Sequence, residues 1–410
     1  MVQRLGRAAA AAVAMAMLAG SVQVVAAAPK QKAPKLSAAV QPLLMKAQTM
    51  QKAGDNAGAV PVLDQAEAAA KTPDDQYMVN VLRLNSAIAL QDNALIEKAL
   101  QGALASGQVP KEEEPKFVRN LGAMALQRND FATATRYFEQ LAQMTPNDTS
   151  IMLDLAELQR RQNQPAKAVQ TVQTAIATQE KATGAKAEEQ WYRRAVGIAY
   201  DAKLPAETAA ATKALLAAYP NPTNWRDALT IYRESAKFDD QMNLDILRLM
   251  RANNALAGER DYAEYAETAS MRGFPGEAKS VLDEGIAKGA LQTTRPFVKE
   301  LTAAITPKIA SDRSALPALE KEAAAAKNGR PALGTADAYL GYGNYAKAAE
   351  LYKMALAKGG VDSDTANLRL GLALGKTGDK AGAEAALKAV AGQPRKGLAE
   401  YYLLWLAQQA

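Results

Sequence analysis

The residue types that most often carry enzyme chemistry are missing from this sequence. Its 410 residues include no cysteine and no histidine, which excludes thiol nucleophiles, disulfides, zinc sites of the usual kind and every histidine-based triad. The segment Gly341-Tyr342-Gly343 is typical of a turn between helices rather than of a phosphate-binding loop. The pair Asp239-Asp240 lacks the ligand spacing of a calcium loop. We therefore expect no cofactor and no metal.

One carboxylate lies in a segment that could supply a catalytic acid. Glu234 is part of the sequence Arg-Glu-Ser-Ala-Lys-Phe at residues 233–238, which resembles the glutamate motif of soluble lytic transglycosylases. Phe238 stands one residue too far along, the Gly-Leu-Met-Gln-type stretch of that family is missing, and no apolar segment surrounds Glu234 to raise its pKa. We interpret Glu234 as a surface residue and expect no enzyme; a wall-cleaving enzyme using Glu234 is the alternative.

The elements that would position any site are expected to be helices. Residues 334–359 have the pattern of two short helices joined by a turn. Ala336 and Tyr339 share one face of the first helix, and Ala348 and Tyr352 share one face of the second. Small residues at such positions let two helices approach closely. The pattern resembles a tetratricopeptide repeat, whose signature is a small residue, a tyrosine three positions on, and then Ala-x3-Phe/Tyr.

Other segments repeat this signature. The most complete copy, at residues 116–148, has Leu121-Gly122 in its first helix and Ala134-x3-Phe138 in its second; from Ala134 to Ala168 is a step of 34, the period of the family. Degenerate copies are expected at residues 77–107, 189–220, 225–255 and 293–327. The resemblance implies an all-α, right-handed superhelical solenoid at residues 37–396, with about ten helix pairs, six of them clear.

A superhelix of this kind has a concave groove lined by the first helix of each pair. Six residues at first-helix positions are the candidates for binding a partner there: Lys116, Arg119, Asn120, Asp154, Glu157 and Arg161. Some family members hold a partner's C-terminal carboxylate with groove lysine, arginine and asparagine, and Lys116, Arg119 and Asn120 resemble part of that clamp. Asp154 and Glu157 depart from it. The alternative is that all six are ordinary solvated helix residues.

The two ends of the chain differ in composition from the repeats between them. Residues 1–27 are typical of a signal peptide, because two arginines, an apolar stretch and small residues follow one another; an uncleaved membrane anchor is the alternative. Residues 28–36 form a basic, proline-containing spacer. Residues 397–410 are expected to cap the array with four large side chains, or alternatively to dock on a partner or membrane. Those side chains are Tyr402, Leu403, Trp405 and Leu406.

Charge and targeting complete the functional hypothesis. The formal net charge of +6 is mild and dispersed, so we expect no nucleic acid partner. Without a cysteine for lipid attachment, and with no integral span once the signal is cleaved, the protein should be periplasmic or secreted. We expect a non-catalytic scaffold of the bacterial cell envelope that holds a protein or peptide in its groove. The alternative is an assembly factor for surface or wall polymers, acting beside an enzyme.

Overall fold

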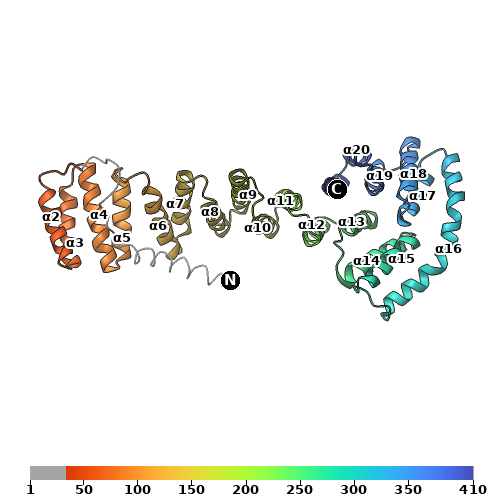
Figure 1. The fold of residues 1–410 in the computed structure, drawn as a ribbon, viewed down its shortest axis with the longest axis horizontal. Helices are drawn as coiled ribbons and strands as arrows, with labels where there is room; N and C mark the ends of the chain where they lie inside the picture. The colour runs from red at the N-terminus through yellow and green to blue at the C-terminus, as the bar shows by residue number, and fades with distance from the viewer. Residues whose placement is uncertain (1–33, 410) are drawn as a thin grey trace. The chain divides into compact units, whose positions relative to one another are not determined.

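The computed structural model describes residues 34–409, and the predicted signal peptide lies outside them. Within the described residues the chain forms 20 α-helices, α2 to α21, and no strand, which confirms the predicted all-α fold (Figure 1). The chain divides after Leu204 into two compact units, which we call the N-terminal unit and the C-terminal unit.

The N-terminal unit is an array of helix pairs. Its helices are α2 (Gln41–Lys52), α3 (Asn56–Ala69), α4 (Pro73–Leu90), α5 (Asn93–Ala105), α6 (Glu114–Gln127), α7 (Phe131–Met144), α8 (Thr149–Arg161), α9 (Pro165–Thr183) and α10 (Glu189–Asp201). The most extensive contacts lie within the pairs α2–α3, α4–α5, α6–α7 and α8–α9, and most of the others join one pair to the next. The unit therefore has the neighbour-to-neighbour organisation of a repeat array.

The C-terminal unit combines helix pairs with a return of the chain end. Its helices are α11 (Pro205–Ala218), α12 (Pro222–Glu234), α13 (Asp240–Ala252), α14 (Gly258–Met271), α15 (Pro275–Ala287), α16 (Pro296–Ala325), α17 (Arg330–Gly341), α18 (Tyr345–Lys358), α19 (Ser363–Thr377), α20 (Lys380–Lys388) and α21 (Arg395–Ala407). Besides contacting α19 and α20, α21 packs on α11 and α13, at the beginning of the unit. This unit is therefore closed by its own last helix.

Five of the turns between paired helices have the same local sequence pattern. A residue with positive φ, between 56° and 86°, is followed by an aspartate or asparagine that caps the next helix. Each capping side chain accepts a hydrogen bond from the backbone N–H three residues on, and such caps stabilise a helix by about 1 kcal/mol. The five turns of this kind are Gly54-Asp55, Gln91-Asp92, Asn129-Asp130, Gly343-Asn344 and Gly378-Asp379.

Close approach within the pairs depends on small residues, as the repeat signature predicts. A Cβ atom on Gly122 would lie 2.8 Å from the Phe138 ring, so only glycine lets α6 and α7 pack at this separation. Ala134, Ala336 and Ala348 are all fully buried. The large partners Phe138, Tyr339 and Tyr352 are 5%, 9% and 0% exposed. The residues that carried the resemblance therefore form the core of their pairs.

The degenerate repeat expected at residues 293–327 is wrong. The structure has one 30-residue helix there, α16, with Pro307 and Pro317 inside it. A helix pair needs a turn residue, and none of the residues of α16 has positive φ. The helix also contains no glycine and no asparagine, the residues that best tolerate left-handed geometry. The chain consequently continues as a single helix between α15 and α17.

The last helix is anchored inside the C-terminal unit. Tyr402 and Trp405 are 1% and 0% exposed, Leu406 is buried and Leu403 is half-buried. The Tyr402 hydroxyl donates to the backbone carbonyl of Asp245 at 2.7 Å. These side chains are covered by their own unit, which argues against the alternative that they dock on a partner or membrane. Among the helices of residues 34–409, none is long and apolar enough to cross a membrane.

Candidate functional site

Charged residues on three successive first helices of the N-terminal unit form a common surface. Arg119 on α6 donates from Nη2 to Oδ2 of Asp148, the N-cap residue of α8, at 3.0 Å. Arg194 on α10 donates from Nη2 to the backbone carbonyl of Leu153 on α8, also at 3.0 Å. The side chains of α6 and α10 thus reach α8 from both sides. We call Arg119, Asp154, Glu157 and Arg194 the first-helix surface.

Glu157 is the most heavily paired carboxylate of this surface. Its Oε1 accepts hydrogen bonds from Arg160 at 2.8 Å and from Arg161 at 3.0 Å, and Arg194 lies 3.6 Å from Oε2. The hydrogen bonds from Arg160 and Arg161 hold the pKa of Glu157 below its ordinary value, although burial acts in the opposite direction. Glu157 is therefore charged at neutral pH and links α8 to α10.

Asp154 differs from Glu157 because it forms no ion pair with any residue of the described chain, 34–409. The side chain is exposed. Nearby protein atoms nevertheless raise its pKa by removing water, while Arg194 and Arg119 act to lower it. Asp154 is thus an accessible carboxylate with two cations close by and none bonded to it. A partner's cationic or amide group could bind there without first breaking an ion pair.

The other predicted candidates have local roles. Lys116 forms an ion pair with Glu113, one turn away, at 2.8 Å. Asn120 is half-buried on α6. The guanidinium of Arg161 lies 5.6 Å from the ring centroid of Phe131 on α7, besides its bond to Glu157. The structure therefore brings Arg119, Asp154 and Glu157 together, whereas Lys116 and Arg161 are directed to neighbours on or beside their own helix.

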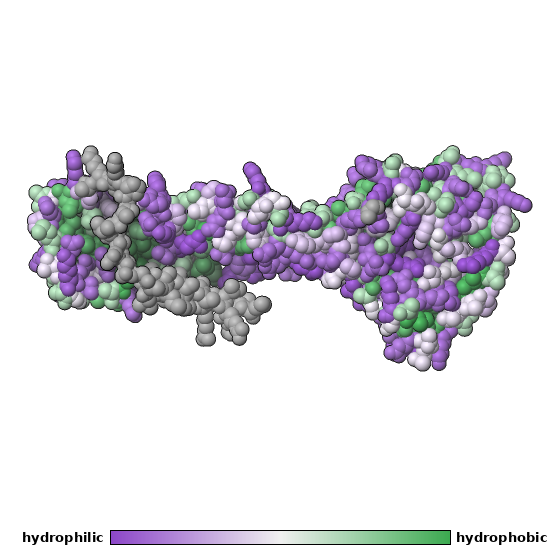
Figure 2. All heavy atoms as spheres, viewed as in Figure 1, coloured by the Kyte–Doolittle hydropathy of each residue, from purple (hydrophilic) through white to green (hydrophobic). Residues whose placement is uncertain are grey.

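Sequence reasoning missed Arg194. Residues 189–220 were expected to hold a degenerate repeat on the evidence of aromatic residues, and the polar face of its first helix was not assigned. Arg194 lies one repeat beyond Glu157, at a first-helix position, and this spacing could have identified it as a candidate. Figure 2 shows hydrophilic and apolar residues interspersed on the visible face of this unit, without one dominant apolar area.

The residue of the catalytic alternative, Glu234, lies at a helix end. It is the last residue of α12 and is exposed, whereas a catalytic acid of this kind is held in apolar surroundings. In the part of the chain that the structure describes, no group of three or more acidic side chains is placed to hold a metal ion. The charged groups of the N-terminal unit are suited to binding through hydrogen bonds and ion pairs.

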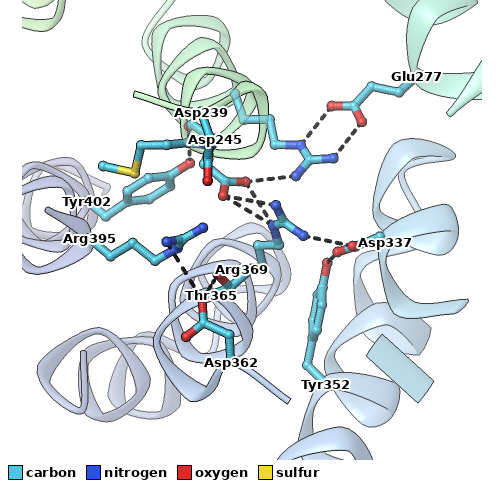
Figure 3. Close-up of polar contacts among 12 residues, drawn as sticks. Asp239, Asp245, Glu277, Asp337, Tyr352, Asp362, Thr365, Arg369, Arg395 and Tyr402 are labelled. Atoms are coloured by element: carbon cyan, nitrogen blue, oxygen red, sulfur yellow. Dashed lines mark hydrogen bonds and ion pairs between the residues drawn. The ribbon is translucent and has the colours of Figure 1, made fainter. Parts of the chain in front are cut away.

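A second, different set of charges lies inside the C-terminal unit. We call Asp245, Arg248, Glu277, Asp337 and Arg369 the buried ion network, and all five are at most 6% exposed. Arg369 on α19 contacts Asp245 on α13 through Nε at 2.9 Å and Nη2 at 3.1 Å, and it also donates to Asp337 on α17 at 2.7 Å (Figure 3). Four helices meet at these side chains, because Glu277 comes from α15.

The remaining hydrogen bonds complete the network. Arg248 binds Glu277 through two parallel bonds of 2.8 and 2.7 Å and Asp245 at 2.8 Å. Buried tyrosine hydroxyls donate to the carboxylates, from Tyr265 to Glu277 at 2.8 Å and from Tyr352 to Asp337 at 2.6 Å. Such pairing is what makes buried charge tolerable.

The electrostatics of the network are strongly perturbed. Burial alone would raise the pKa of Glu277, but Arg248 and Tyr265 outweigh it and hold the pKa below its ordinary value. Burial and the Glu277 carboxylate raise the pKa of Tyr265 well above its ordinary value. Burial and Asp337 do the same for Tyr352. Glu277 therefore stays ionised, and Tyr265 and Tyr352 stay neutral, over the physiological range.

Comparison with known proteins agrees with the repeats seen in both units. Residues 125–188 and residues 333–397 each match a family model described as tetratricopeptide repeat. The first segment lies in the N-terminal unit and the second in the C-terminal unit. No curated protein matches the sequence.

Solved structures give distant likenesses. A Pseudomonas aeruginosa protein described as pilF is 12% identical, with a TM-score of 0.23, over 65% of this chain and 97% of that one. A tetratricopeptide repeat protein from Parabacteroides merdae is 12% identical, with a TM-score of 0.27, over 66% and 100%. The tetratricopeptide domain of P58(IPK) is 13% identical, with a TM-score of 0.25, over 83% and 98%.

The matched segments and the packing lead to one conclusion. In each unit the small and aromatic residues of the repeat signature are buried against one another. The family models match in the same two regions. The chain therefore contains tetratricopeptide repeats in both of its units.

Proposed function

We propose that this protein is a non-catalytic scaffold of the bacterial cell envelope, which holds a protein or peptide partner on the first-helix surface of its N-terminal unit. Tetratricopeptide repeats support a role as a protein-interaction scaffold, and proteins built from them are generally non-catalytic. The observation that carries the proposed location is the exposed, unpaired carboxylate of Asp154 between Arg119 and Arg194.

The chemistry of this surface favours a polar partner. It offers a carboxylate at Asp154 and guanidiniums at Arg119 and Arg194, so a peptide could bind with both its donors and its acceptors. The ion pairs that hold the two arginines are partly solvated, with side chains 31–48% exposed. Exchanging such pairs for contacts with a partner costs little, because exposed ion pairs contribute about 0–1 kcal/mol each.

The binding test compares two sets of substitutions in the full chain. The first, Arg119→Ala, Asp154→Ala and Arg194→Ala, removes two cations and one carboxylate from the first-helix surface. The matched control, Arg136→Ala, Lys167→Ala and Glu139→Ala, removes the same charges from the second helices α7 and α9. Each protein is used to capture cross-linked partners from envelope extract, which are quantified by mass spectrometry, and helix content is checked by circular dichroism.

The two sets have opposite expected outcomes. A partner captured by the unaltered chain should be retained by the second-helix control and lost from the first-helix variant. Single substitutions are not informative enough, since rim charges contribute little one at a time. If a folded first-helix variant captures the same partner as strongly as the control does, the binding site lies elsewhere.

Location in the envelope has a separate test. The proposal rests on the signal-like residues 1–27 and on the lack of a cysteine for lipid attachment. N-terminal sequencing of the protein recovered from the bacterial envelope should begin at Ala27 or Ala28. Recovery of a chain that retains Met1 would overturn the proposed export and leave the binding proposal to be judged by the capture experiment.

A further inference from the structure

A cavity of about 530 Å³ lies in the C-terminal unit, beside the buried ion network. Helices α13, α14, α15, α16, α17, α18 and α19 all contribute to its wall. This volume falls within the range of pockets that hold small molecules, roughly 300–1,000 Å³, and is too small for a folded partner. The cavity belongs to one unit and is independent of the first-helix surface.

The charged side chains of the wall are mostly cationic. The wall contains five cationic groups, Arg248, Arg251, Lys288, Arg313 and Lys376, and two carboxylates, Glu277 and Glu284. Three positive charges are therefore left in excess. Low-dielectric walls around charges of one sign concentrate the field inside a cavity, and this favours ligands of opposite charge.

Three of the cations are already paired. Arg248 binds Glu277 within the buried ion network. Arg251 donates to Glu284 at 2.6 Å and to the Ser280 hydroxyl at 2.7 Å. Lys288 donates to the same Glu284 at 2.9 Å. One carboxylate thus serves two cations, which leaves part of their charge uncompensated.

The other two cations lie over aromatic rings. The guanidinium of Arg313 lies 4.8 Å from the ring centroid of Tyr342, and the amine of Lys376 lies 5.6 Å from that of Trp405. Neither forms an ion pair with any residue from 34 to 409. Burial and the nearby Arg251 lower the pKa of Lys376 from its ordinary value. An anion in the cavity would offset this repulsion.

We propose that this cavity binds a small organic polyanion, a molecule carrying two or three negative charges as phosphate or carboxylate groups. Arg313 and Lys376 bind its anionic groups directly, because neither is held in an ion pair with a carboxylate of residues 34–409. Arg251 and Lys288 share Glu284 and supply a second donor cluster on the same wall. Tyr345, which also lines the cavity, offers a ring and a hydroxyl to the non-ionic part of the ligand.

The test measures binding of defined probes by isothermal titration calorimetry with the full chain. Pyrophosphate and glucose 6-phosphate represent phosphate ligands, citrate represents carboxylate ligands, and glucose is the neutral control. The test variant is Arg313→Met with Lys376→Met, which keeps an aliphatic chain over each ring. The matched control is Arg272→Met with Lys353→Met, which removes one arginine and one lysine from exposed positions that do not line the cavity.

The proposal predicts saturable binding of at least one of the three anions and none of glucose. The Arg313 and Lys376 double variant should bind at least about tenfold more weakly, because two charge-assisted hydrogen bonds are lost, and the control should bind unchanged. Lys376→Arg, which keeps the charge, should retain binding, and the circular dichroism spectrum of the double variant checks that its loss of binding is not a folding defect. No binding of any anion, or equal binding by both double variants, overturns the proposal.

Discussion

The first-helix surface of the N-terminal unit and the buried ion network of the C-terminal unit place their charges in opposite environments. In the N-terminal unit, the ion pairs of Arg119 and Arg194 have side chains that are 31–48% exposed. In the C-terminal unit, the pairs that join Asp245, Arg248, Glu277 and Arg369 have side chains that are 1–4% exposed. The same residue types therefore serve as an accessible polar surface in one unit and as internal connections in the other.

The difference in burial has an energetic consequence. An exposed pair contributes about 0–1 kcal/mol, since water replaces either partner at little cost. Removing one member of a buried pair costs about 3–5 kcal/mol, because a charge is left without water or partner. Charges of the first kind are free to exchange for a binding partner, whereas those of the second kind hold distant helices in one arrangement.

The separation along the sequence between bonded residues also differs between the two units. Pairs in the N-terminal unit join helices that are one repeat apart, such as Arg119 with Asp148, 29 residues away. Arg369 meets Asp245 across 124 residues, and Tyr402 meets it across 157. The C-terminal unit also has one continuous core, from Leu216 to Leu406. We infer an additive array in the first unit and a cooperative closed body in the second.

The largest expected difference comes from removing one arginine from each unit. Arg369→Ala leaves Asp245 and Asp337 buried with too few donors, so the C-terminal unit should lose about 3–5 kcal/mol of unfolding free energy. Arg119→Ala removes an exposed pair and should cost the N-terminal unit about 0–1 kcal/mol. Urea denaturation of the full chain, followed by hydrogen exchange in each unit, measures both. Similar losses from the two substitutions would contradict the contrast.

Alkaline pH should also separate the units. Tyr265, Tyr352 and Tyr402 have folded-state pKa values well above 10.0, chiefly because they are buried. A raised pKa gives stability that is complete below the unfolded value, near 10, and is lost as pH rises above it, because only the unfolded chain then ionises. The C-terminal unit should therefore lose stability above about pH 10.

The N-terminal unit supplies the control for that pH experiment. In this unit Tyr77 has a pKa raised by burial and by Glu113, and Tyr192 is its one buried tyrosine among the residues that the structure describes, so its alkaline loss should be smaller than that of a unit with several buried tyrosines. Below about pH 4.5 both units should lose stability, since Glu157 and Glu277 both have lowered pKa values and lose their stabilisation as pH falls. Hydrogen exchange at pH 7 and above pH 10 makes the comparison; equal alkaline sensitivity would refute it.

Inserting a larger side chain between two paired helices should reduce stability moderately, and the loss of protection should reach different distances in the two units. Ala134→Leu and Ala348→Leu each insert a large side chain at a fully buried position and should cost about 1–3 kcal/mol. In the N-terminal unit the loss of protection should remain near α6 and α7. In the C-terminal unit it should extend to α13 and α21. Hydrogen exchange of each variant gives the pattern, and an unchanged melting temperature in both would refute close packing at these alanines.

Local patterns predicted the packing of the repeats well. Ala134 with Phe138, and Ala348 with Tyr352, are spaced by the helical period, so their shared face and its burial follow from the sequence. The turn residues are equally local. The error at α16 has the same origin, because a repeat period was extended over a segment that lacks any turn residue.

Contacts between residues far apart in the sequence could not be predicted from the local patterns. Nothing near Arg369 indicates that its partner is Asp245, because only the return of α21 and α19 to α13 brings them together. The cavity depends on seven helices and was not predicted. For the groove candidates, position on a first helix was predictable, but side-chain pairing was not. Lys116 is paired with Glu113, and Arg194 was overlooked.

Hydrogen exchange of the unaltered full chain at neutral pH tests the contrast between the units most directly. The amides of α13 and α21 should open with the same free energy, because the buried ion network and Tyr402 make them parts of one cooperative body. In the N-terminal unit, protection should vary from one helix pair to the next, as expected for an array stabilised by its neighbours. If α21 exchanges freely while α13 stays protected, the C-terminal unit is not closed and the account is wrong.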